Sequence, residues 1–147
     1  MYRHILIATD GSERASKGVQ HGLALAARLQ AKATVLTVSE PINTGFDDAL
    51  GWSAVATSLP DFQNARNEAA RKVLDAAAEG ERAGVTPQLL HVADRYAAET
   101  IVDTAERQGC DLIVMASHGR RALGRLLLGS QTSEVLARCG VPVLVIR

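Results

Sequence analysis

Short apolar runs rich in β-branched residues alternate with stretches of helical periodicity along this chain, and this alternation most constrains its fold. The predicted strands cover residues 4–9, 33–38, 86–92, 112–115 and 142–146. Such an alternation predicts an α/β fold in which a mostly parallel sheet carries helices on both faces. With 147 residues and no visible repeat, we expect a single domain spanning residues 1–147.

Four helical stretches separate the predicted strands. Ser12 is expected to cap the first, and Gly109 ends the third, which begins at Asp94 or Arg95. The others run from Asp61 toward residue 80 and from about residue 131 to residue 138. Residues 42–60 contain the single tryptophan, lack any periodicity and are expected to form a long loop.

The segment from residue 111 to residue 134 combines a strand, a glycine-bounded loop and a helix start. The run 112–115 leads to Gly119, and nine residues later to Gly129-Ser130. Glycine lets backbone N–H groups approach an anion, and the first amides of a helix are unpaired at the positive end of its dipole. The pattern therefore indicates a phosphate cradle, with an ordinary chain turn as the alternative. Neither a P-loop nor a dinucleotide fingerprint occurs.

Composition limits the class of ligand. Sixteen basic and sixteen acidic residues balance, so no global field favours nucleic acid or an anionic membrane, and any anion site must be local. No apolar span approaches membrane length, and we expect a soluble, cytoplasmic protein. Cys110 and Cys139 lack metal-site spacing and are expected to be reduced structural thiols, with a disulfide or metal site as the alternative.

The glycine-bounded segment resembles the ATP-binding signature of the universal stress protein family, which is G-x-x-G, nine residues and G-[ST]. Here the pattern is Ala116-Ser117-His118-Gly119, nine residues and Gly129-Ser130, so alanine replaces the first glycine. The opening HILIATDGSE, the second strand ATVLTVSEP and the closing VPVLVIR also stand where the family has them. The resemblance implies a Rossmann-like open sheet of order 3-2-1-4-5.

That order places the chain reversal between the first and fourth strands, where ligands bind in open α/β sheets. The backbone of Val38 is then expected at the adenine and Asp10 at the ribose, although Asp10 before Gly11 also fits a turn or capping role. Backbone amides of one set of residues, with the Ser130 hydroxyl, are expected at the phosphates: Gly119, Gly129, Ser130 and Gln131. The resemblance adds residues that line the pocket: Ala8, Thr9, Met115, Ala116 and Thr132. His118, beside the expected phosphates, is also expected to line the site.

The expected ligand is ATP, with ADP or AMP as alternatives and Mg²⁺ held only through the phosphates. No carboxylate near His118 in sequence orients it for proton transfer, so we expect a binding module with at most weak hydrolysis. Two alternatives stay open: a nucleotide-free interaction scaffold, which Ala116 favours, and an enzyme acting on an α–β phosphate bond.

The last apolar run, within Val141–Arg147, is expected at a sheet edge. An unpaired apolar edge promotes aggregation unless something covers it. A second copy of the same strand, related by a two-fold axis, is the simplest cover, and the resemblance also implies such a homodimer. Cover by a neighbouring loop or helix of the same chain is the alternative.

Overall fold

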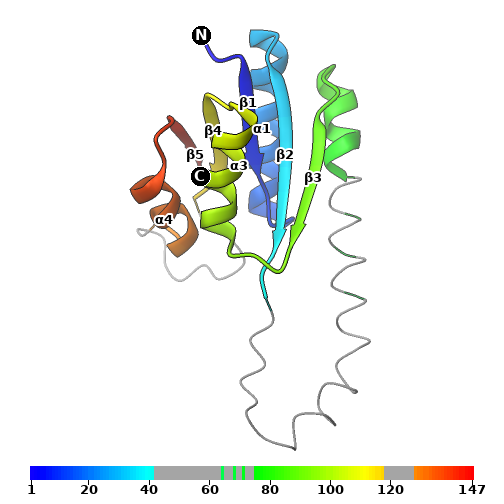
Figure 1. Ribbon diagram of the computed structural model, residues 1–147. Coiled ribbons are helices and arrows are strands. Elements are labelled where there is room, and N and C mark those ends of the chain that lie inside the picture. Colours follow the sequence, from blue (N-terminus) through cyan, green and yellow to red (C-terminus); the bar gives the residue numbers. More distant parts are fainter. Residues whose placement is uncertain (42–63, 65–67, 69–70, 72–74, 118–127) are drawn as a thin grey trace, which may run out of the picture.

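The computed structural model describes residues 1–41, 64, 68, 71, 75–117 and 128–147. Five strands form one sheet in the order β3-β2-β1-β4-β5, and every neighbouring pair is parallel (Figure 1). A helix at residues 75–83 precedes β3. The labelled elements are β1 His4–Ala8, α1 Glu13–Leu29, β2 Lys32–Ser39, β3 Gln88–Ala93, α3 Ala97–Gln108, β4 Leu112–Ala116, α4 Ser130–Arg138 and β5 Val143–Ile146.

The predicted fold class and strand order are confirmed. Element ends differ where local backbone chemistry intervenes. The third predicted helix begins later, at Ala97, because Asp94 takes a left-handed φ of 57° and the Arg95 amide bonds to Ser39 O. The final strand begins after Pro142, which has no amide hydrogen to give to a ladder. The 42–60 loop with its tryptophan lies outside the described residues, as do His118 and Gly119.

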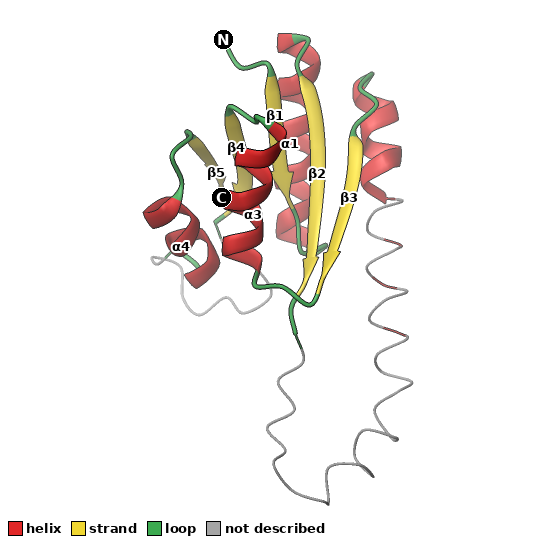
Figure 2. Ribbon diagram, in the orientation of Figure 1, coloured by secondary structure: helices red, strands yellow, loops and turns green. Residues whose placement is uncertain are grey.

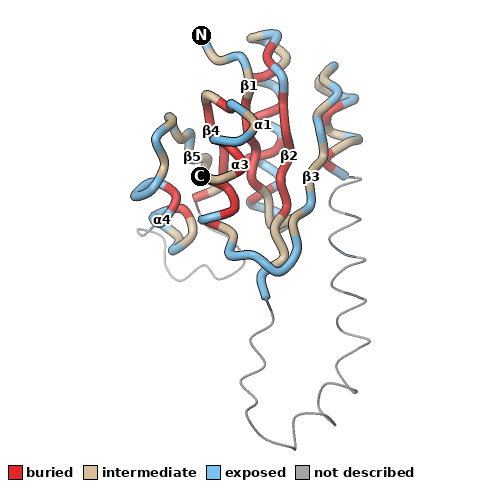
Figure 3. The backbone as a smooth tube through the Cα atoms, viewed as in Figure 1, coloured by how far each residue is buried: buried red, intermediate tan, exposed pale blue. Residues whose placement is uncertain are grey.

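Two apolar layers cover the sheet because successive side chains of a strand point to opposite faces. In β1, Ile5 and Ile7 face α1 and the 75–83 helix, whereas Leu6 faces α3 and α4. Figure 2 shows helices on both sides of the sheet, and Figure 3 shows burial concentrated in β1, β2 and β4. The central strands are thus buried on both faces, as a parallel sheet requires.

Polar contacts connect strands at the end of the sheet where the parallel strands begin. Asp111 accepts hydrogen bonds from the amides of Arg3 and His4 at 2.8–3.0 Å, which joins the start of β1 to the start of β4. Burial acts to raise the pKa of Asp111, but these backbone hydrogen bonds and the Arg3 charge outweigh it and lower the pKa below its usual value.

The two cysteines are free thiols, as predicted. Cys110 is buried among apolar side chains of α3 and β4. Burial, with a smaller contribution from the Asp111 charge, raises the pKa of Cys110 to about 11. Because the thiolate is the reactive form of cysteine, Cys110 is an inert packing residue at neutral pH.

Two glycines on one face of α1 let this helix approach the sheet. A Cβ at Gly18 would lie 3.4 Å from the backbone nitrogen of Ala116, an ordinary contact. A Cβ at Gly22 would lie 2.7 Å from two carbon atoms of Ile7, a fully buried side chain. Of these two glycines of α1, Gly22 is therefore the one that packing against the sheet requires.

We expect Gly18→Ala and Gly22→Ala to differ in the free energy of unfolding. Alanine is favoured over glycine in a helix by roughly 1 kcal/mol, so Gly18→Ala should stabilise the protein by up to that amount. Gly22→Ala gains the same propensity but overpacks Ile7, and should be about 1–3 kcal/mol less stable than Gly18→Ala. Urea denaturation measures both values. Equal stability of the two variants would show that the contact with Ile7 does not constrain α1.

Candidate functional site

The carboxyl ends of the strands meet at the edge where β1 and β4 lie side by side. Ala8 of β1 is in register with Met115 of β4, and both side chains are buried. Connections leave these two strands on opposite faces of the sheet, since α1 packs on one face and α4 on the other. This is the reversal point at which open α/β sheets bind ligands.

The turn after β1 is held by its own side chains. The Thr9 hydroxyl accepts a hydrogen bond from the Gly11 amide at 3.0 Å, and Asp10 Oδ1 accepts one from the Ser12 amide at 2.9 Å. Gly11 has a φ of 71°, a conformation that favours glycine, and Ser12 caps α1 through the Ala15 amide. Asp10 therefore performs the turn role that was its alternative, and it stands at the predicted crevice.

Two hydrogen-bond donors, the Gly129 amide and the Thr132 hydroxyl, fix the start of α4 to the end of β4. The Gly129 amide donates to Ser117 O at 2.8 Å. The Thr132 hydroxyl, in a residue only 2% exposed, donates toward Ala116 O at 3.1 Å and Ser117 O at 3.3 Å. Thr132 was expected to line the pocket, but its hydroxyl is turned inward to the end of β4. It holds the helix start in place.

The first turn of α4 presents unused amides. The first intrahelical bond runs from the Ser133 amide to Gly129 O, and Gly129 gives no side-chain cap. The amides of Ser130, Gln131 and Thr132 donate to no other described residue. They are the unpaired donors that a helix start offers to an anion. Gly129 has φ −59° and ψ 153°, which any residue adopts, so only the lack of a Cβ distinguishes it.

The Gln131 side chain has contacts that sequence reasoning missed. Its Oε1 accepts a hydrogen bond from the Ala98 amide in α3, and its Nε2 donates to Glu40 just after β2. Glu40 was not among the predicted site residues, and no spacing pattern connects positions 40, 98 and 131. Val38, expected at the adenine, lies near the end of β2 and is partly buried against the α3 and α4 layer.

A cavity of about 320 Å³ lies beside the turn after β1, on the face of the sheet that carries α1. It is lined by the turn, by α1 and by the 75–83 helix: Thr9, Gly11, Ser16, Val19, Gln20, Asp75, Ala76, Ala78, Glu79 and Arg82. Its lining shares only Thr9 with the predicted nucleotide site, so the two regions adjoin at the β1 turn.

The described residues include no group of three or more His, Cys, Asp or Glu side chains arranged to hold a metal ion. The predicted Mg²⁺ was assigned to ligand phosphates and needs no such cluster. Among the helices described, none is long and apolar enough to cross a membrane.

The fold and this edge together define a Rossmann-like α/β domain, a class that places ligands at the reversal point of its parallel sheet. The profile of the Universal stress protein family matches residues 1–147. Universal stress protein MJ0577 of Methanocaldococcus jannaschii is 31% identical over 156 residues, covering 100% of this chain and 96% of that protein. The chain belongs to the universal stress protein family.

Solved structures agree with this assignment. The structure of protein MJ0577 matches with a TM-score of 0.77 at 31% identity, over 99% of this chain and 96% of that one. A universal stress protein crystallised in complex with cAMP matches with a TM-score of 0.74 at 22% identity, covering 99% and 97% of the two chains. One from Archaeoglobus fulgidus in complex with dAMP gives 0.67 at 18% identity, covering 99% and 98%.

We expect Gly129→Val to abolish binding of an adenine nucleotide while the protein stays folded. The backbone angles of Gly129 suit valine, whereas a β-branched side chain at this position would obstruct an anion that approaches the helix amides. Calorimetric titration and circular dichroism measure the two properties. Gly140→Val is the matched control, because a Cβ at Gly140 meets nothing within 4 Å. Undiminished ATP binding by folded Gly129→Val protein would show that the α4 start is not the phosphate site.

Proposed function

We propose that this protein binds ATP at the carboxyl edge of its sheet and acts in the cytoplasm, in the stress response, by changing its own state or its partners when the nucleotide binds. The observation that carries this proposal is the set of amides in the first turn of α4 that donate to no residue in the described ranges and that lie at the same edge as the Asp10 turn. A chain with zero formal charge can attract a polyphosphate only through such a local feature.

Family membership supports an adenine nucleotide as the ligand. Two relatives of the same fold were crystallised with cAMP and with dAMP, and both ligands combine adenine with a phosphate. In our proposal the phosphates of ATP meet the α4 amides, the ribose meets Asp10 and the adenine meets the backbone of Val38. ADP and AMP share these contacts, and Mg²⁺ accompanies the phosphates. The Gly119 amide is also expected at the phosphates, and Thr132 contributes only its backbone amide in the first turn of α4. The remaining predicted lining residues surround the ligand: Ala8, Thr9, Met115, Ala116 and His118.

A nucleotide-free interaction scaffold is the second candidate function, and Ala116 is the observation that favours it. This residue ends β4, where the family signature has glycine. A Cβ at Gly18 of α1 would lie 3.4 Å from the backbone nitrogen of Ala116, so α1 packs close to this residue. The alanine methyl is a small obstacle, and we therefore retain nucleotide binding as the proposed function. Slow hydrolysis of the bound ATP would be a further activity of the same site.

ATP is expected to raise the melting temperature. A ligand present at about 100 times its dissociation constant adds roughly 2.7 kcal/mol to the free energy of unfolding. For a domain of this size that corresponds to a shift of roughly 5–11 °C. Thermal denaturation with millimolar ATP, ADP, AMP and cAMP provides the measurement, with GTP as the control for the base. If no adenine nucleotide changes the melting temperature, the scaffold function is favoured instead.

We also propose that two copies associate through β5, within the predicted segment Val141–Arg147. Of the described strands only β4 pairs with β5, and Leu144 is 39% exposed. Pro142 O and Ile146 O accept hydrogen bonds from amides of β4 and its end. Because bonding groups alternate along a strand, the N–H groups of Val143 and Val145 point toward the open edge. A second β5 strand would pair there in an antiparallel arrangement.

Val145→Pro tests this interface selectively. The substitution removes an N–H on the open edge and leaves the hydrogen bonds to β4 in place, so we expect a folded monomer or a precipitate. Val145→Thr keeps the N–H and a β-branched shape, and should remain dimeric. Light scattering at tens of micromolar protein determines the mass. A monomeric parent protein, or a dimeric proline variant, would contradict an interface formed by β5.

A further inference from the structure

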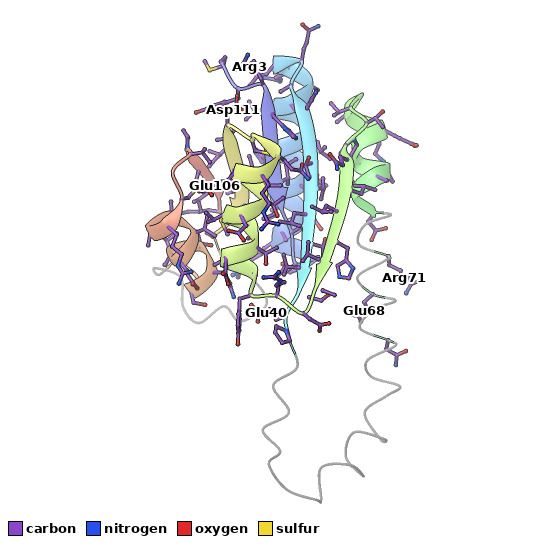
Figure 4. All side chains as sticks on the ribbon, in the orientation of Figure 1. Arg3, Glu40, Glu68, Arg71, Glu106 and Asp111 are labelled. Carbon is purple, nitrogen blue, oxygen red and sulfur yellow. The ribbon has the colours of Figure 1, made fainter. Side chains whose placement is uncertain are left out.

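Gln131 connects three chain segments at the carboxyl edge of the sheet. It is the second residue of α4, and its Oε1 accepts the Ala98 amide hydrogen at 3.1 Å. Its Nε2 donates to Glu40 Oε1 at 2.7 Å. Figure 4 shows Glu40 at this edge, where β2 and β3 end and α3 begins. One side chain thus joins the first turn of α4 to the first turn of α3 and to the exit of β2.

The contact with α3 replaces a missing cap. Tyr96 stands at the N-cap position of α3 and makes no side-chain capping bond. The Ala98 amide belongs to the first turn, where no intrahelical acceptor exists, and the Gln131 oxygen supplies one from another helix. The amide side chain of Gln131 provides both this acceptor and the donor to Glu40. The bond to the carboxylate is charge-assisted and therefore the stronger of the two.

The position of Gln131 has a consequence for ligand binding. Its own backbone amide belongs to the proposed phosphate cradle, and Glu40 lies two residues after Val38, where the proposed site receives the adenine. We propose that Gln131 is a positioning residue, which through Glu40 fixes the adenine-binding end of β2 relative to the phosphate-binding first turn of α4. This inference rests on the proposed function and assigns Glu40 and Gln131 a role in nucleotide affinity. The bond between them sets the distance that a nucleotide must span.

A double-mutant cycle on a neutral background tests the proposal. Glu40→Gln keeps an oxygen acceptor for Gln131 Nε2 and removes a charge that would repel phosphate, so it is the reference protein. Glu40→Ala removes the acceptor, and Gln131→Met removes both hydrogen bonds at similar side-chain volume. The cycle compares the reference, Glu40→Ala, and each of these two combined with Gln131→Met. It thereby separates the bond between residues 40 and 131 from the cap on α3.

We expect Glu40→Ala to bind ATP about fivefold more weakly than Glu40→Gln, the factor that one hydrogen bond of about 1 kcal/mol provides. In the Gln131→Met background the two substitutions at residue 40 should give equal dissociation constants, because no donor remains. Calorimetric titration with ATP gives these constants, and thermal melting of ligand-free protein gives stability. Glu134→Gln is the control on the same helix. It removes a carboxylate charge and weakens only the exposed ion pair with Arg138, so the coupling between residues 40 and 131 in ATP affinity should stay the same.

The outcomes separate this inference from the proposed function. A parent protein without affinity for adenine nucleotides would overturn both. A parent that binds ATP while Glu40→Ala and Glu40→Gln bind it equally would overturn the positioning role alone. Coupling between residues 40 and 131 in the melting temperature but not in ATP affinity would show a purely structural bond, and would also overturn the role. Coupling in ATP affinity supports it.

Discussion

Every strand of this sheet runs in the same direction, and the rest of the structure depends on that constraint. Parallel strands need crossover helices, and these helices bury both faces of β1 and β4 under aliphatic side chains. The same constraint brings all carboxyl ends to one edge. A chain that places β1 in the middle must then reverse direction beside it, which creates a junction between the turn after β1 and the start of α4.

At that junction the polar side chains mostly serve the backbone. Thr9 and Asp10 shape the turn, Thr132 holds the end of β4, and the Gln131 side chain joins α4 to α3. Within the part of the chain that the structure describes, the first turn of α4 offers backbone amides to an incoming anion. Fixed amides need no reorganisation when a ligand arrives, and glycine or serine beside them leaves the approach open. An overall neutral protein can therefore offer a locally positive site.

The sequence predicted the fold well because hydrophobic periodicity reports local geometry. Alternating apolar runs indicated five strands, and their order came partly from the family resemblance. Errors occurred where one backbone angle decides a boundary, as at Asp94 with its φ of 57°. The site was less predictable. Asp10 looks the same in sequence whether it holds a turn or meets a ribose, and the structure shows the turn bond. The contact between Glu40 and Gln131 joins residues 91 apart and follows no periodic pattern.

The place of β1 in the sheet also affects how the protein is made. Of the strands in this sheet β1 comes first along the chain, and only α1 separates it from its neighbour β2, but its other neighbour, β4, follows about a hundred residues later. At roughly 5–20 residues per second, the second edge of β1 waits about 5–20 seconds for its partner on the ribosome. During that interval Ile5, Leu6 and Ile7 form an open strand edge on the nascent chain. A strand that is buried on both faces in the finished protein therefore needs protection during translation.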